Sequence, residues 1–187
     1  MRQLIITENI TVDGVIDLAG GWFTPSTSAE EDADQLAVLR KQDETADGLL
    51  LGRQTFEDFR GYWPLQTDDQ TGITAYLDQV QKYVLSTTLS EPRWQNTTIL
   101  SGNLVEEVRA LKQSDGMDIV CTGSVTVARA LVSTGLVDEF RLFVYPVVMG
   151  RGARLFEESP EMPRLELAES RSFRSGVVLL RYRPIAG

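Results

Sequence analysis

Residues 48–57 read Gly-Leu-Leu-Leu-Gly-Arg-Gln-Thr-Phe-Glu, and this stretch indicates the class of fold. The apolar run at 48–51 has the length of a short buried strand. Gly52 then supplies a turn, and the polar segment at 54–59 is typical of the first turns of a helix. A strand that passes through a glycine turn into a helix is the unit from which parallel α/β sheets are built.

The same order of strand, turn and helix recurs around residue 123. Residues 119–121 are a short apolar strand, Gly123 and Ser124 follow it, and apolar residues at helical spacing predict a helix over 125–133. The other predicted elements are strands at 4–12, 83–85, 97–100 and 140–148, a helix at 104–112, and a closing hairpin of 165–172 with 176–183. This alternation predicts a mostly parallel sheet with helices on both faces and an antiparallel edge.

The segment before residue 42 carries the start signal of another helix. Ser28 followed by Glu31 fits a capping box, in which each side chain binds the other residue's backbone amide. Four acids, Glu30, Glu31, Asp32 and Asp34, favour the positive end of a helix that runs to about residue 42. For most of these acids, a solvated helix start is the simpler interpretation.

Composition limits the classes of function. The chain has 187 residues, of which 42% are hydrophobic and 24% charged, so residues 1–187 have the size and composition of a single globular domain. Its apolar runs fall far short of the roughly 20 residues of a membrane span, and no secretion signal is visible, so we expect a cytoplasmic protein without a membrane partner. With 27 acids against 18 bases, the net charge of −9 disfavours nucleic acid as a partner.

The numbers of histidines and cysteines narrow the chemistry further. The chain has no histidine, which removes the Ser-His-Asp and Cys-His nucleophile systems and the common zinc sites, so no metal is expected. Its single cysteine, Cys121, lies in the apolar run 117–121 and is interpreted as a core residue of a buried strand. Any catalysis therefore depends on carboxylates, hydroxyls, backbone dipoles or a bound cofactor.

Three strand ends carry residues suited to phosphate groups. In sheets of this kind, ligands bind beyond the carboxyl ends of the strands, where helix N-termini favour anions. Gly123 and Ser124 open a helix and suit a pyrophosphate, and Arg53 beside Thr55 suits a phosphate monoester. A glycine between a strand and a helix is most often only a turn, so it is the combination that favours a nucleotide. The residues concerned are Gly52, Arg53, Thr55, Ser86, Thr87, Gly123 and Ser124.

Several stretches of the chain resemble a known family, in the right order and over nearly the whole length. They are residues 11–14, 50–57, 82–89, 123–124, 135–139, 146–152 and 155–156. These stretches look like the dihydrofolate reductase-like superfamily, and more closely like the reductase domain of the bifunctional riboflavin-biosynthesis deaminase/reductase and its stand-alone relatives. The resemblance implies a three-layer αβα fold with a mixed central sheet, and NADPH lying across its carboxyl edge.

The resemblance also implies roles for individual residues. Arg53, with the hydroxyls at 86–87, would meet the 2′-phosphate of the adenosine, and residues 123–125 would hold the pyrophosphate at the helix N-terminus. Phosphate recognition of this kind favours NADPH over NADH. The cofactor-binding residues are then Gly52, Arg53, Thr55, Ser86, Thr87, Gly123, Ser124, Val125 and Ile16.

The loop at 13–23 matches the family's loop near the nicotinamide. There, Ile16 and Trp22 would keep water away from the hydride transfer, and Trp22 would contact the substrate. Trp22 is equally well interpreted as a surface or core aromatic residue.

Hydride transfer to a carbon joined to oxygen or nitrogen also requires a proton, so an acid near the substrate is expected. The candidates are Asp13, Asp32 and Asp34, and the sequence does not decide among them. Asp13 precedes a glycine and is also a common turn former. Asp32 shares a helical face with the apolar Leu36 and Leu39, which favours it. Asp13 and Asp32 are therefore the predicted catalytic residues.

The function predicted by these residues is an NADPH-dependent reductase of a small heterocycle of the pteridine or pyrimidine kind. The zinc deaminase half of the riboflavin enzyme has no counterpart in a chain with no histidine and one cysteine. The alternative is a non-catalytic nucleotide-binding or interaction protein that keeps the fold. Apolar residues between 173 and 182 favour a homodimer that covers the terminal hairpin, unless they pack on the chain's own core.

Overall fold

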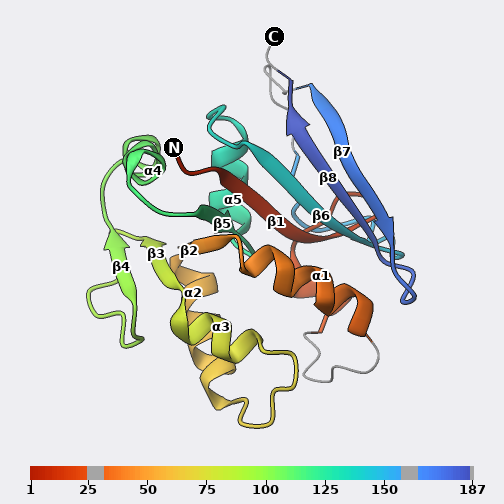
Figure 1. Cartoon of the computed structure of the whole chain (residues 1–187), viewed down its shortest axis with the longest axis horizontal. Coiled ribbons are helices and arrows are strands. Elements are labelled where there is room, and N and C mark those ends of the chain that lie inside the picture. Colours follow the sequence, from red (N-terminus) through yellow and green to blue (C-terminus); the bar gives the residue numbers. More distant parts are fainter. Residues whose placement is uncertain (25–31, 157–163, 186–187) are drawn as a thin grey trace.

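The computed structural model describes residues 1–24, 32–156 and 164–185. Its strands are β1 (Leu4–Thr11), β2 (Ala46–Gly52), β3 (Gln81–Leu85), β4 (Thr97–Leu100), β5 (Asp118–Cys121), β6 (Glu139–Tyr145), β7 (Leu165–Ser172) and β8 (Val178–Pro184). Within these ranges they form an eight-stranded sheet in the order β4-β3-β2-β5-β1-β6-β8-β7 (Figure 1). Strands β1 to β6 pair in parallel, and β8 pairs antiparallel with β6 and β7. The predicted mixed, mostly parallel sheet with a C-terminal antiparallel hairpin is confirmed.

β1 lies inside the sheet because its first half is apolar on both faces. Leu4, Ile5 and Ile6 are all fully buried. The strand pairs in parallel with β5 on one side and with β6 on the other. A strand buried on both faces reads as a continuous apolar run, and this one does so until Thr7.

The helices are α1 (Ala33–Asp43), α2 (Arg53–Tyr62), α3 (Ile73–Gln79), α4 (Leu104–Gln113) and α5 (Val125–Val132), with the short 3-10 helices η1 (Leu18–Gly20) and η2 (Trp63–Leu65). On one face of the sheet, Val108 of α4 and Leu131 of α5 belong to the same core cluster as Leu4. On the other face, Phe56 of α2 and Leu77 of α3 cluster with residues of β2 and β3. The sheet is therefore covered on both faces, as a three-layer αβα fold requires (Figure 1). In the described part of the chain, no helix is both long and apolar enough to cross a bilayer.

α1 and the terminal hairpin share a third core cluster. Val38 of α1 packs with Phe143 of β6 and with the hairpin residues Phe173, Val177 and Leu179. These three hairpin residues are thus buried within the chain itself, whereas Val178, Leu180 and Tyr182 are partly buried. This packing accounts for the pattern that favoured a homodimer, and the homodimer stays a prediction.

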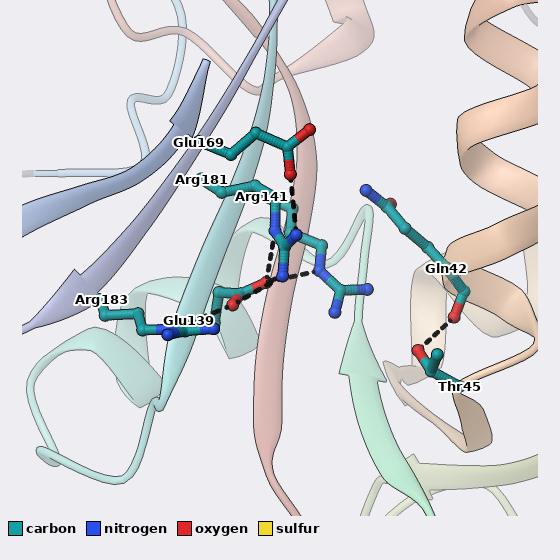
Figure 2. A network of polar contacts seen from close by, with 7 residues as sticks. All are labelled: Gln42, Thr45, Glu139, Arg141, Glu169, Arg181 and Arg183. Atoms are coloured by element: carbon teal, nitrogen blue, oxygen red, sulfur yellow. Dashed lines mark hydrogen bonds and ion pairs between the residues drawn. The ribbon is translucent and has the colours of Figure 1, made fainter. Parts of the chain in front are cut away.

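A buried carboxylate ties the same hairpin to the start of β6. Glu139 accepts hydrogen bonds from Arg141 at 2.7 Å, from Arg181 at 2.9 Å and from Arg183 at 3.2 Å. Arg181 also pairs with Glu169 of β7 at 2.8 Å. Figure 2 shows the three arginines, from β6 and β8, converging on Glu139, and Glu169 of β7 bound to Arg181. Because Glu139 is only 1% exposed, its ionised form is stabilised by these arginines rather than by water.

β6 is shorter than predicted. It ends at Tyr145 rather than at residue 148, because Pro146 follows and has no amide to donate to a neighbouring strand. The chain turns at this point, where the Val147 amide donates to the Tyr145 carbonyl at 2.7 Å and the Val12 amide donates to the Val147 carbonyl at 2.9 Å.

Two helices also depart from the prediction. α1 begins at Ala33 with Asp32 as its N-cap, and the predicted capping box of Ser28 with Glu31 lies outside the described residues. α3 was not predicted at all. It is seven residues long, and its start is stabilised by Asp69, which accepts from the amides of Thr71 and Thr74 at 2.8 Å each.

Candidate functional site

The ends of β2 and β5 are joined at the carboxyl edge of the sheet. The Gly52 amide donates to Ser124 Oγ at 2.8 Å, and Thr55 Oγ1 donates to the Gly123 carbonyl at 3.1 Å. The parallel pairing of the two strands, in which Leu50 lies opposite Cys121, places the two turns next to each other. The structure therefore brings together the two strand-end turns that the sequence analysis singled out. Cys121 itself is fully buried in the core, as predicted.

At both glycines an added Cβ would make a tight contact. Gly123 adopts a φ of +67°, and a Cβ added there would lie 3.1 Å from Thr55 Cγ2. A Cβ on Gly52 would lie 3.1 Å from Val127 Cγ2. The end of β2 is thus packed closely against α5, and the turn before α5 is packed closely against α2.

Two groups predicted to contact a pyrophosphate face inward instead. Ser124 is buried and its hydroxyl oxygen accepts the Gly52 amide. The Gly123 amide donates to Glu8 Oε2 at 3.0 Å. What remains for an anion is the first turn of α5, which begins at Val125 and receives no side-chain cap from Ser124. Amides in the first turn of a helix have no partner within the helix and favour anions.

Glu8 was missed by sequence reasoning. Its side chain is 3% exposed, and burial raises its pKa to about 8, although the hydrogen bond from the Gly123 amide opposes the rise. Oε1 has no hydrogen-bond partner among the described residues. One feature of the sequence could have indicated Glu8: it is an acidic residue within the predicted strand Leu-Ile-Ile-Thr-Glu-Asn-Ile-Thr, whose other residues are apolar or uncharged.

A groove with three arginines lies beside the start of α2. It has a volume of about 650 Å³ and is lined by Arg53, Glu57, Arg60, Thr88, Leu89, Ser90, Glu91 and Arg93. Arg53 pairs with Glu57 at 2.8 Å and Arg93 with Glu91 at 2.8 Å, both as exposed ion pairs. Because exposed pairs of this kind contribute little free energy, their guanidinium groups can turn to a bound phosphate at low cost. The sequence analysis found Arg53 and missed Arg60 and Arg93.

The predicted hydroxyls at 86–87 do not line this groove. Ser86 Oγ accepts from the amides of Thr88 at 3.1 Å and Leu89 at 2.9 Å, so it shapes the loop that forms one wall. Thr87 is exposed. Thr88 and Ser90 supply the hydroxyls of the wall in their place.

Aromatic side chains gather at the carboxyl ends of β1 and β6. The ring of Tyr145 lies 5.6 Å from that of Trp22 and 5.5 Å from that of Phe23, both in edge-on orientation. Trp22 Nε1 donates to the Asp17 carbonyl at 2.8 Å. Trp22 is therefore held in a cluster of aromatic rings, and its predicted contact with a substrate stays a prediction. Ile16, by contrast, is 3% exposed and belongs to the core cluster between the sheet and α5.

Polar groups from α1 border the aromatic cluster. Gln35 Nε2 donates to the Tyr145 hydroxyl at 3.3 Å, while Gln35 Oε1 is buried and has no partner among the described residues. Burial raises the pKa of Tyr145, the hydrogen bond from Gln35 opposes the rise, and the charge of Asp32 adds to it. Asp32 occupies the N-cap position of α1, but its side chain makes no capping hydrogen bond. Because its charge acts on Tyr145, Asp32 lies near the aromatic rings.

The other two candidate acids have other partners. Asp13 accepts from Thr11 Oγ1 at 2.7 Å and from the amides of Met149 and Gly150 at 3.1 and 2.8 Å, which together lower its pKa to about 2. A carboxylate so strongly held in its ionised form is a poor proton donor, and this one fastens the turn after β1 to the 149–150 loop. Asp34 accepts from the Arg174 amide at 3.0 Å, and this bond lowers its pKa.

The order of the sheet, its two helix-covered faces and the paired turns at its carboxyl edge define a dihydrofolate reductase-like domain. The chain belongs to the RibD C-terminal domain family, which matches residues 2–179. This is the reductase domain family of the riboflavin-biosynthesis deaminase/reductase, and membership supports an oxidoreductase.

Individual relatives agree with this assignment. The uncharacterized protein YyaP of Bacillus subtilis (strain 168) is 31% identical over 188 residues, covering 97% of this chain and 94% of YyaP. A solved structure from Shewanella sp. PV-4, whose name assigns it to riboflavin biosynthesis, has a TM-score of 0.73 at 19% identity and covers 98% of this chain and 99% of that one. A pyrimidine reductase-like protein from Corynebacterium diphtheriae has a TM-score of 0.68 at 18% identity and covers 100% of this chain and 93% of that one. The two structures share the fold.

Proposed function

We propose that the protein is an NADPH-dependent reductase that transfers a hydride to a small heterocycle of the pyrimidine or pteridine kind. Membership of the RibD C-terminal domain family supports this reaction class. The observation that carries the proposal is the joining of two glycine turns, through Gly52 and Ser124, beside a groove with three arginines. One feature suits a pyrophosphate and the other suits a further phosphate.

The residues present fit a phosphorylated dinucleotide. Gly123 has no Cβ of its own to cover the start of α5, and an added Cβ would lie only 3.1 Å from Thr55 Cγ2. The first-turn amides of α5, starting at Val125, would hold the pyrophosphate. Arg53, Arg60 and Arg93 would take the 2′-phosphate that distinguishes NADPH from NADH. When bound, NADPH supplies the hydride from its nicotinamide ring.

The aromatic cluster is the proposed substrate site. The faces of Trp22 and Tyr145 suit a planar ring, and Gln35 Oε1 is a buried acceptor that a ring N–H would satisfy. Among the candidate acids we assign the proton source to Asp32, because Asp13 is held ionised and Asp34 is fastened to residue 174. Asp13 then keeps its place in the site as a positioning residue for the loops at the sheet edge.

Calorimetric titration with NADPH and, separately, NADH tests the cofactor. We expect NADPH to bind at least about tenfold more tightly, because only NADPH carries a phosphate for the arginine groove. Binding of neither nucleotide would overturn the proposal. The loss of NADPH absorbance with pyrimidine and pteridine substrates then tests turnover, and binding without any oxidation would favour the non-catalytic nucleotide-binding alternative.

We also propose a cytoplasmic homodimer. Support for the homodimer comes from β7, which lies at an edge of the sheet and so has backbone groups that a second copy could pair with. Leu167 on this strand is 55% exposed and could be covered by that copy. Sedimentation equilibrium tests this directly, and a monomer at micromolar concentration would contradict it.

A further inference from the structure

Glu8 lies on β1 beyond the point where the neighbouring strand β5 ends. The two strands pair only as far as Ile6 and Cys121. The Glu8 carboxyl therefore reaches the turn that leads from β5 into α5, and its Oε2 accepts from the Gly123 amide at 3.0 Å. Its Oε1 has no hydrogen-bond partner among the described residues. A buried carboxyl with one free oxygen thus lies directly under the turn.

The turn is held between Glu8 and α2. On the sheet side the Glu8 carboxyl holds the Gly123 amide, and on the other side Thr55 donates to the Gly123 carbonyl at 3.1 Å. The Gly123 backbone also approaches Thr55 too closely to admit a Cβ without a shift. A change in the charge or position of the Glu8 carboxyl is therefore transmitted to Gly123 and to the first turn of α5.

The surroundings of Glu8 contain little that would balance a negative charge. Burial raises its pKa to about 8, and the Gly123 amide is the one group that opposes the rise. From β5 it is faced by Cys121, a buried thiol whose own pKa is raised by burial and by Glu8. In the described residues, no charged side chain of α5 or β6 contributes to the shift. At neutral pH the Glu8 carboxyl is therefore uncharged.

We propose that Glu8 is a positioning residue of the dinucleotide site, and that its ionisation weakens the binding of the pyrophosphate. This inference rests on the proposed function. The negative charge of an ionised Glu8 would offset the positive potential of the Gly123 amide and the α5 N-terminus. Because Glu8 is buried, this charge would also repel a pyrophosphate bound there. A neutral carboxyl leaves the positive potential available to the ligand. By reciprocity, a bound dinucleotide keeps the proton on Glu8, so the protein takes up a proton when the dinucleotide binds above neutral pH.

The test is a calorimetric titration with NADPH between about pH 7 and about pH 9.5, where phosphate groups with a second pKa of about 6 no longer change their charge. For the unmodified protein we expect the dissociation constant to rise at least about tenfold over this range. E8Q has the same shape and keeps an acceptor for the Gly123 amide, so its dissociation constant should not change with pH. E166Q, an exposed glutamate on β7, is the matched control and should follow the unmodified protein.

Proton uptake gives a second readout. Near pH 8, titrations in two buffers with different ionisation enthalpies should show that the unmodified protein takes up protons with NADPH and that E8Q does not. Equal pH profiles for the unmodified protein and E8Q overturn the inference and leave the proposed function standing, whereas no NADPH binding at any pH overturns both. If E8Q does not fold, the absence of proton uptake by the unmodified protein overturns the inference.

Discussion

The Gly52 amide donates a hydrogen bond to Ser124 Oγ at 2.8 Å, and this bond joins two turns that are 72 residues apart in the chain. Each turn follows a strand and precedes a helix, so the bond also fixes the start of α2 relative to the start of α5. The arginine groove opens from the first of these helices and the proposed pyrophosphate site from the second. The two proposed phosphate sites are thus linked by the hydrogen bond between Gly52 and Ser124.

Replacement of Ser124 by alanine should therefore weaken the fold. The partly buried Gly52 amide would lose its acceptor, which costs about 1–3 kcal/mol. Urea denaturation of S124A measures this loss. The exposed Ser101 offers a matched control, and S101A should leave the free energy of unfolding unchanged. Equal stability of S124A and S101A would show that the bond to Gly52 is not needed.

The close approach of Gly123 to Thr55 makes a second prediction. G123A forces a Cβ onto a residue with φ of +67° and towards Thr55 Cγ2, so we expect a loss of about 1–2 kcal/mol from the backbone and more from the contact. T55S removes Cγ2 and keeps the Oγ1 bond to the Gly123 carbonyl. The double variant should recover part of the loss in a double-mutant cycle. Strict additivity would mean that the contact is harmless.

Arg53 should distinguish the two nicotinamide nucleotides. R53A removes a guanidinium from the groove, and we expect NADPH to bind about 1–3 kcal/mol more weakly while NADH, which lacks the 2′-phosphate, binds as before. Calorimetry with both nucleotides checks this. Arg109, exposed on α4, supplies the control variant R109A. An equal loss for NADPH and NADH would remove the 2′-phosphate role from Arg53.

Glu8 should make the stability of the nucleotide-free protein depend on pH. Its folded-state pKa of about 8 lies above its ordinary value of 4.5, so between these values the folded protein holds a proton that the unfolded chain has released. The contribution of Glu8 to stability is therefore greatest below about pH 4.5 and is lost as the pH rises towards 8, by up to about 5 kcal/mol in total. Urea denaturation of the unmodified protein and E8Q at several pH values isolates this contribution. A constant difference between the two would contradict the raised pKa.

Much of the fold follows from short-range patterns. β4 and β7 have the predicted boundaries because turn residues flank apolar or alternating runs. The helix after Gly123 begins where predicted, because its apolar residues recur at helical spacing after a small polar residue. α3 was not predicted, since it has seven residues and is stabilised at its start by Asp69, which precedes it in the loop.

The site was less predictable, because its members meet only through tertiary structure. Gly52 and Gly123 could be found from the local sequence, because each comes after an apolar run and before a predicted helix. Arg60 and Arg93 carry none, since their place in the groove depends on how α2 packs beside the loop after β3. For Asp13, the sequence indicated a turn or a catalytic acid. The hydrogen bond from the Thr11 hydroxyl, together with those from the distant amides of the 149–150 loop, explains why its pKa is lowered.

The place of β1 also matters during synthesis. β1 is made early, yet both of its neighbours in the sheet, β5 and β6, lie in the second half of the chain: Leu4 pairs with Ile119, and Ile5 with Glu139. While the ribosome produces the intervening residues, the apolar run at 4–6 has no strand to pair with and remains open to misassociation. The apolar run at 4–6 therefore gains both of its sheet neighbours only after residues 118–145 have been made.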